Sequence, residues 1–140
     1  MAAYELHRGL QTLPVRVRAQ QATAIKVADW LSAQPAVERV HYPGLTDPSG
    51  LIGRQQAGPG AVLAFTLSGG YAAASQVASR VKLITHAVSL GGVDTLIQHP
   101  AALTHRLVAA DAKPSPGLLR LSLGLEDPED LTSDLAEALA

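Results

Sequence analysis

The strongest constraint on the fold of this chain comes from two short apolar stretches that have the character of strands. The first, LITHAV at 83–88, stops at Ser89 and is followed by Gly91 and Gly92. Two adjacent glycines let the backbone bend and approach another group closely. We therefore expect a strand over 84–88 that ends in a tight turn.

The second stretch is LLRLSL, residues 118–123, which carries one arginine among its leucines. Side chains alternate between the two faces of a strand, so the leucines at odd-numbered positions share one face. Leu118, Arg120 and Ser122 share the other face. We expect the two strands to end beside a common cleft, with Ser89 and Arg120 at its edge.

Helices are predicted at both ends of the chain. Apolar residues recur at helical spacing after Pro14, which suits a first helical turn, so we place a helix over roughly 14–33. Residues 4–12 lack a clear start signal. The last helix has the clearest start, because Asp127 can cap it and Pro128 can take its first position.

The remaining elements complete a two-layer architecture. We expect further strands at 37–42 and 61–67, the second buried on both faces, and further helices at 71–80 and about 100–107. About four strands with helices mainly on one face make an α/β (α+β) two-layer sandwich. A length of 140 residues suits one domain, 1–140.

Charge and composition argue against several classes of function. The chain has 11 basic and 12 acidic residues, a net charge of −1, and no run of Lys or Arg, so we expect no nucleic-acid partner. The absence of cysteine excludes disulfides and cysteine metal sites, and it fits a cytoplasmic protein. No apolar run approaches the length of a membrane span, so we expect no membrane partner.

Arg120 is the best candidate for a functional residue. A guanidinium on a strand flanked by leucines costs free energy if it is desolvated alone, so it needs an anionic partner. Its planar fork matches a carboxylate in two parallel hydrogen bonds, which points to the α-carboxylate of an amino acid. The alternative is an arginine on the wet face of an edge strand.

The turn that follows the first strand can serve the same anion. Its residues, Ser89, Leu90, Gly91 and Gly92, can present backbone N–H groups and a hydroxyl, although an ordinary strand-ending turn is the commoner interpretation. None of the five histidines falls into a metal-ligand spacing. The acidic cluster at 126–130 is interpreted as a helix N-terminus.

Three segments resemble one enzyme family: AVSLGGVDTLIQHPA at 87–101, ALTH at 102–105, and GLLRLSLGLEDPEDLTSDLAEAL at 117–139. They are similar to the C-terminal, small domain of the Cys/Met-metabolism enzymes that depend on pyridoxal 5'-phosphate (PLP). These fold-type I trans-sulfuration enzymes include cystathionine γ-synthase, cystathionine γ-lyase, methionine γ-lyase and O-acetylhomoserine sulfhydrylase. Residues 8–31 and 35–45 agree with the start of that domain, so the resemblance covers nearly the whole chain.

The resemblance implies roles for individual residues. Arg120 matches the family arginine that binds the substrate α-carboxylate, and Ser89 in the SLGG segment matches a serine that helps at the same group. Leu90 belongs to that segment. Thr104 matches the threonine of a Thr-His motif near the site. Val88 stands where the family varies the residue beside the substrate side chain, which affects the choice of reaction.

The departures from the family pattern are as informative. The family lysine that forms the imine with PLP lies in a Ser-x-x-Lys stretch of a large domain, and Lys26, Lys82 and Lys113 are the only lysines here. The cofactor-binding domain is absent, and the segment between His105 and Leu118 is shorter than usual. We expect the isolated chain neither to bind PLP nor to catalyse γ-elimination or γ-replacement.

Two functions remain open on the sequence. The first is the C-terminal domain of a trans-sulfuration enzyme, from a truncated reading frame or a split gene, which contributes the substrate carboxylate site. The second is a stand-alone α/β module that binds an amino acid or a partner protein without catalysis. A third possibility is that the chain pairs with a separate large-domain chain. The family is homotetrameric, whereas we expect this fragment to be a monomer or weak dimer.

Overall fold

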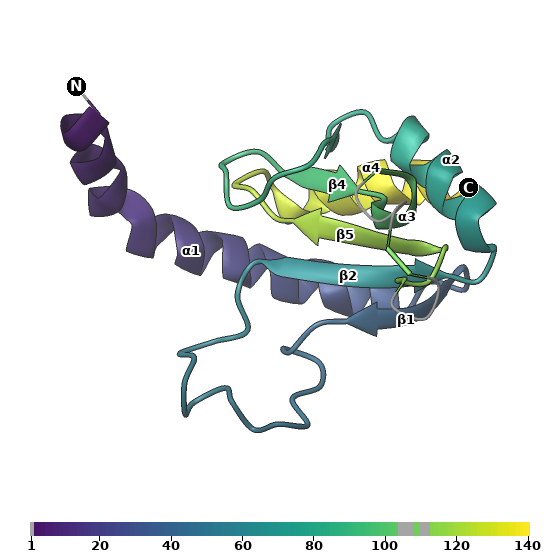
Figure 1. Cartoon of the computed structure of the whole chain (residues 1–140), viewed down its shortest axis with the longest axis horizontal. Coiled ribbons are helices and arrows are strands. Elements are labelled where there is room, and N and C mark those ends of the chain that lie inside the picture. The colour runs from purple at the N-terminus through teal and green to yellow at the C-terminus, as the bar shows by residue number, and fades with distance from the viewer. Residues whose placement is uncertain (1, 104–107, 110–112) are drawn as a thin grey trace.

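The computed structural model describes residues 2–103, 108–109 and 113–140. Its elements, in chain order, are α1 (Ala2–Ser32), β1 (Val37–His41), β2 (Val62–Leu67), α2 (Gly70–Arg80), β3 (Thr85–His86), β4 (Leu96–Gln98), α3 (Pro100–Leu103), β5 (Leu118–Ser122) and α4 (Pro128–Leu139) (Figure 1). Residues 104–107 of the helix expected at 100–107 lie outside the described part of the chain. None of the helices in the described ranges is long and apolar enough to cross a bilayer.

A mixed sheet forms the centre of the fold. Its strand order is β1-β2-β5-β4-β3, and all neighbours are antiparallel except β3 and β4, which run parallel. The sheet therefore has five strands where about four were expected. The expected strand at 84–88 shortens to β3, and the prediction missed β4, whose three residues are too few for side-chain alternation to reveal.

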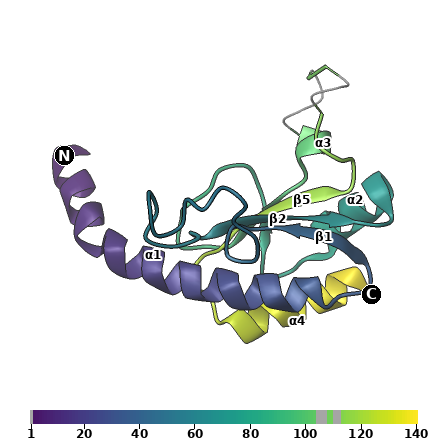
Figure 2. The same cartoon turned by 90° about the horizontal axis from the view of Figure 1, so that it is seen from below.

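Three helices cover one face of the sheet, which confirms the two-layer architecture. Figure 2 shows α1 and α4 on one side and the short α3 on the other, and α2 packs against α4, β2 and β5. The leucines at odd positions of the 118–123 segment are buried in the core, as predicted. On β2 the opposite face is partly open, since Val62 is exposed and Ala64 half-buried, so the expected burial of both faces is wrong.

The first helix begins much earlier than its sequence predicted. It runs from Ala2 through Pro14, which lacks the N–H for one helical hydrogen bond. In the same stretch of the helix, Arg16 Nη2 donates to the carbonyl of Gly9 at 3.0 Å. The N-terminal turns of α1 bend and project from the body (Figures 1 and 2), and residues 2–15 are exposed throughout.

The last helix follows its sequence signals closely. The side chain of Asp127 caps it by accepting from the backbone N–H of Glu129 at 2.8 Å. Further along, Asp134 is buried and accepts three backbone N–H groups, from residues 82, 83 and 84, at 2.8, 3.1 and 2.9 Å. A single carboxylate therefore fixes the chain just before it enters β3.

Asp134→Ala is expected to lower the free energy of unfolding by about 2 kcal/mol, because it leaves buried backbone donors without an acceptor. Urea denaturation followed by circular dichroism measures the change. Glu137→Ala is the matched control on the same helix, since its ion pair with Lys82 is exposed to solvent and contributes little to stability. Equal losses in the two variants would contradict this assignment.

Tyr42 gives the fold a dependence on high pH. Its hydroxyl donates to the carbonyl of Gly60 at 2.8 Å and closes the loop between β1 and β2. Burial, with Asp29 nearby, raises the pKa of Tyr42 to about 12. The folded chain thus holds a proton that the unfolded chain releases at the ordinary pKa of 10.0.

We expect the stability contributed by this proton to be present below pH 10 and lost as the pH rises through the folded pKa near 12. The free energy of unfolding should therefore fall more steeply above pH 10 in the wild type than in Tyr42→Phe. Denaturation at a series of pH values measures the difference. Parallel profiles for the two proteins would show that this phenol does not stabilise the alkaline state.

Candidate functional site

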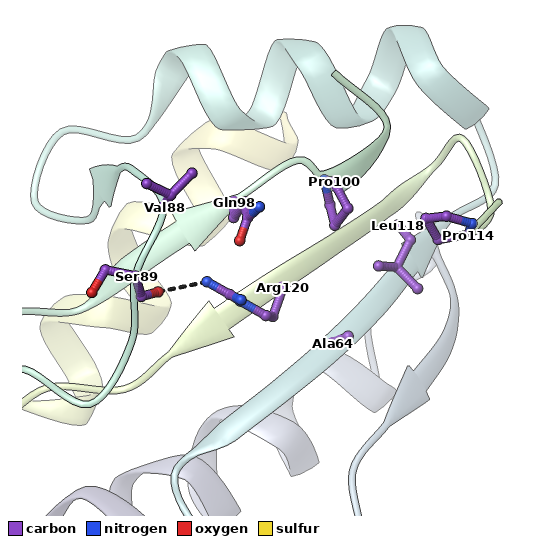
Figure 3. Close-up of a pocket in the computed structure, with 8 residues that line it drawn as sticks. All are labelled: Ala64, Val88, Ser89, Gln98, Pro100, Pro114, Leu118 and Arg120. Atoms are coloured by element: carbon purple, nitrogen blue, oxygen red, sulfur yellow. Dashed lines mark hydrogen bonds between the residues drawn. The ribbon is translucent and has the colours of Figure 1, made fainter. Parts of the chain in front are cut away.

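A cavity of about 490 Å³ lies on the open face of the sheet. Figure 3 shows the side chains around it, which come from β2, β4 and β5, from the start of α3, from the turn after β3 and from the segment before β5. The lining residues are Ala64, Val88, Ser89, Gln98, Pro100, Pro114, Leu118 and Arg120. Most of this lining is apolar, so a charged side chain within it needs a partner to compensate its loss of solvent.

Arg120 supplies that charge. The register of the sheet places it between Ala64 on β2 and Gln98 on β4, on the face opposite the leucine core. Its Nη2 donates to the backbone carbonyl of Ser89 at 2.5 Å (Figure 3). Its Nε is buried and has no hydrogen-bond partner among the residues that the structure describes. The guanidinium therefore retains an unused donor beside the cavity.

Ser89 meets Arg120 as predicted, but through its main chain. Its carbonyl oxygen is the acceptor, and its φ of 89° puts it in the left-handed region that non-glycine residues rarely adopt. Such a conformation persists where the surrounding contacts over-determine it, and it occurs often at binding sites. The turn is therefore a built feature of the cavity and not a loose strand end.

The other candidate residues have different positions. Val88 lines the cavity and is 53% exposed, so its side chain is available to a ligand. Leu90 is 57% exposed and lies outside the cavity lining. Thr104 falls outside the described residues. The structure thus brings Arg120, Ser89 and Val88 together around one space.

Two polar side chains that the sequence reasoning missed hold the same turn. Ser122 Oγ accepts from the backbone N–H of Gly91 at 2.9 Å, and Gln20 Nε2 donates to the carbonyl of Gly92 at 2.6 Å. Both are buried, at 1% and 3% exposure. A signal for Gln20 exists in the sequence, because it is a polar residue on the otherwise apolar stripe that includes Val17 and Ala24.

The segment between the turn and β4 is fastened to the end of β5. Glu126 accepts from both the backbone N–H and the hydroxyl of Thr95, each at 2.6 Å, and Thr95 Oγ1 in turn accepts from the N–H of Gly124 at 2.8 Å. A Cβ at Gly124 would collide with the carbonyl oxygen of Val93. Glu126 thus has a specific tertiary partner beyond the general helix N-terminus role assigned to its cluster.

The open face of the sheet is electrostatically suited to an anion. His41 and Arg39 lie on β1 opposite Ala64 and Thr66, and His41 Nε2 is 3.1 Å from the hydroxyl of Thr66. Burial, together with the positive charge of Arg39, lowers the pKa of His41 below its ordinary 6.5. The ring is therefore largely neutral at pH 7, and among the described lining residues the positive charge is that of Arg120.

The residues around the cavity do not fit a PLP imine. None of the three lysines lines the cavity: Lys26 is exposed on α1, Lys113 is exposed before β5, and Lys82 pairs with Glu137 at 2.7 Å. Among the described residues, no group of three or more His, Asp and Glu side chains could hold a metal ion. Among the described residues, no imine-forming amine lines the cavity, so what this lining offers chemically is recognition of an anionic group by Arg120.

Comparison with characterised proteins identifies relatives of this arrangement. The chain is 60% identical over 141 residues to an L-methionine gamma-lyase of Brevibacterium sandarakinum, an alignment that covers 99% of this chain and 36% of that protein. It is 42% identical over 140 residues to the L-methionine gamma-lyase of Pseudomonas putida, covering 96% and 35%. The chain thus spans little more than a third of the length of these relatives.

Solved structures agree with the sequence comparison. The chain matches the crystal structure of the cystathionine gamma-lyase CalE6 from Micromonospora echinospora with a TM-score of 0.87 and 43% identity, over 94% of this chain and 36% of that one. It matches metB from Corynebacterium glutamicum with a TM-score of 0.88 and 38% identity, over 94% and 35%. The family model for Cys/Met metabolism PLP-dependent enzymes matches residues 1–140, and the chain therefore belongs to that family.

Proposed function

We propose that this chain is the small, single domain of a cytoplasmic PLP-dependent sulfur amino-acid enzyme that acts by γ-elimination or γ-replacement, and that it contributes the substrate α-carboxylate site. The unpartnered Nε of Arg120, buried beside a cavity, is the observation that carries this proposal. A guanidinium in an apolar lining needs an anion to compensate its desolvation, and a carboxylate can take two donors of one fork.

The neighbours of Arg120 define what the carboxylate site would select. The Ser89 carbonyl already occupies Nη2 and fixes the plane of the guanidinium, which limits the directions from which a second acceptor can approach. In this proposal Val88 would contact the first atoms of the substrate side chain, and Leu90 belongs to the adjoining turn at 89–92. The role of Thr104 comes from the family resemblance alone. The site therefore favours an amino acid with an apolar or thioether side chain.

The chemistry of the reaction must come from elsewhere, because PLP supplies the electron sink for carbanion formation and its imine lysine is not in this cavity. We propose a separate large-domain chain as the partner. The exposed apolar residues on the projecting half of α1 offer it a surface: Tyr4, Leu6, Leu10, Leu13 and Val17 are 40–68% exposed. Without such a partner, the chain is expected to be a monomer or weak dimer with a tendency to aggregate.

A stand-alone amino-acid-binding module is the second candidate. The observation in its favour is that one 140-residue chain supplies the arginine, the turn and the cavity wall together. Binding without catalysis needs nothing more than these groups. The two candidates share the carboxylate site and differ in whether a second chain completes an enzyme.

Arg120→Ala is expected to weaken the binding of L-methionine at least tenfold, because a charge-assisted hydrogen bond contributes about 1.5–3 kcal/mol. Isothermal titration calorimetry with the wild type and the variant measures the loss. Arg39→Ala, on the same face but outside the cavity lining, is the matched control and should bind like the wild type. The wild type should bind L-methionine methyl ester, which lacks the anionic carboxylate, as weakly as Arg120→Ala binds L-methionine.

Equal affinity of the wild type and Arg120→Ala, or tight binding of the ester, would refute the carboxylate site. Circular dichroism of each variant ensures that an unfolded protein is not mistaken for a loss of binding. Binding by the wild type supports a working module, whereas no binding by any protein would leave the chain inert on its own.

The isolated chain, mixed with PLP and L-methionine or cystathionine, is expected to form no α-keto acid beyond the rate of free PLP. The physical reason is that none of its lysines reaches the cavity that holds Arg120. A coupled assay for the keto acid measures this, with a full-length L-methionine gamma-lyase as the positive control. Turnover clearly above that of free PLP would overturn the prediction.

A further inference from the structure

The turn at 89–92 is held in a conformation that its own sequence does not favour. Ser89 has a φ of 89° and Gly91 a φ of 77°. Glycine takes the left-handed region freely, but for serine this conformation is disfavoured and must be maintained by other contacts. The turn therefore depends on the groups that anchor it.

Two of the anchors come from one strand. Arg120 and Ser122 lie two residues apart on the same face of β5, and they hold the carbonyl of Ser89 and the N–H of Gly91. Contacts from a single strand fix the turn along one edge only. A contact from a different element would restrain the turn from a second side.

The third anchor comes from a different element, 72 residues away in the sequence. Gln20 projects from α1, is 3% exposed, and donates its side-chain amide to the carbonyl of Gly92 at 2.6 Å. Only the NH₂ group of the amide can donate to a carbonyl, so the orientation of the amide is dictated by this contact. The helix on one side and β5 on the other thus hold the turn between them.

We propose that Gln20 is a positioning residue of the carboxylate site: its amide holds the turn at 89–92 in the conformation that presents Ser89 to Arg120. This inference rests on the proposed function for its consequence in binding. Its structural part, the restraint of the turn by Gln20, rests only on the hydrogen bond to Gly92 and can be tested separately.

The neighbouring residue provides a matched control. Gln21 Oε1 accepts from the backbone N–H of Gly60 at 3.1 Å, so it fastens a different loop to the same turn of the same helix. Gln20→Leu and Gln21→Leu therefore remove one side-chain amide each from adjacent positions. A general loss of stability would affect both variants, whereas a positioning role affects one loop in each.

Amide hydrogen exchange followed by NMR in the full chain provides the decisive readout. In Gln20→Leu, the Gly91 amide is expected to exchange at least tenfold faster than in the wild type, while amides of α4 and β5 keep their rates. In Gln21→Leu, the faster exchange should appear at Gly60 and not at Gly91. Gln20→Glu, which keeps the size but cannot donate when ionised, gives the same test if the leucine variant fails to fold.

Calorimetry with L-methionine tests the consequence for the site. Gln20→Leu is expected to bind about tenfold more weakly than the wild type, and Gln21→Leu to bind equally well. Unchanged Gly91 exchange in both Gln20 variants, or equal acceleration in Gln21→Leu, would overturn the proposal. If the wild type itself does not bind L-methionine, the chain is inert on its own, and the Gly91 exchange rates still decide whether Gln20 restrains the turn.

Discussion

The alternation of side chains along β5 is the constraint on which both halves of the structure depend. One face carries leucines that are fully buried among the helices, and the other carries Arg120 and Ser122. The two faces belong to the same backbone. Packing of the leucine face therefore fixes the position of the central strand β5 and, with it, the point from which the Arg120 side chain starts. The energy that orders the site comes from the hydrophobic core beneath it.

The polar contacts around the cavity form a second level of organisation on this base. Three side chains hold backbone groups of one connecting segment: the buried Gln20 of α1, the buried Ser122 of β5, and the half-buried Glu126 just before α4. Each such contact satisfies a main-chain group that would otherwise be costly to bury. A segment with almost no regular structure is thereby tied to the helix on one side and to the region of β5 and α4 on the other.

Sequence reasoning found those parts of the fold whose signals are local. The leucine face of β5 and the cap at Asp127 follow from spacing and from residue type, and both are confirmed. β4 is too short for a pattern, and α1 continues through Pro14, a residue that usually marks a helix start or a break. Within the site, Arg120 stood out as a charge among leucines. Gln20 stands out only as a polar residue on an apolar helix face, and nothing local indicates its partner 72 positions away.

The continuity of α1 has a thermodynamic consequence. The same helix carries an exposed apolar end, which includes Leu6 and Leu10, and, further along, the Gln20 amide that donates to the carbonyl of Gly92. A partner that binds the exposed end and moves the helix must also change the strength of the Gln20–Gly92 hydrogen bond. Linkage then makes the effect mutual: occupancy of the cavity would change the affinity at the distant end of the helix by the same factor.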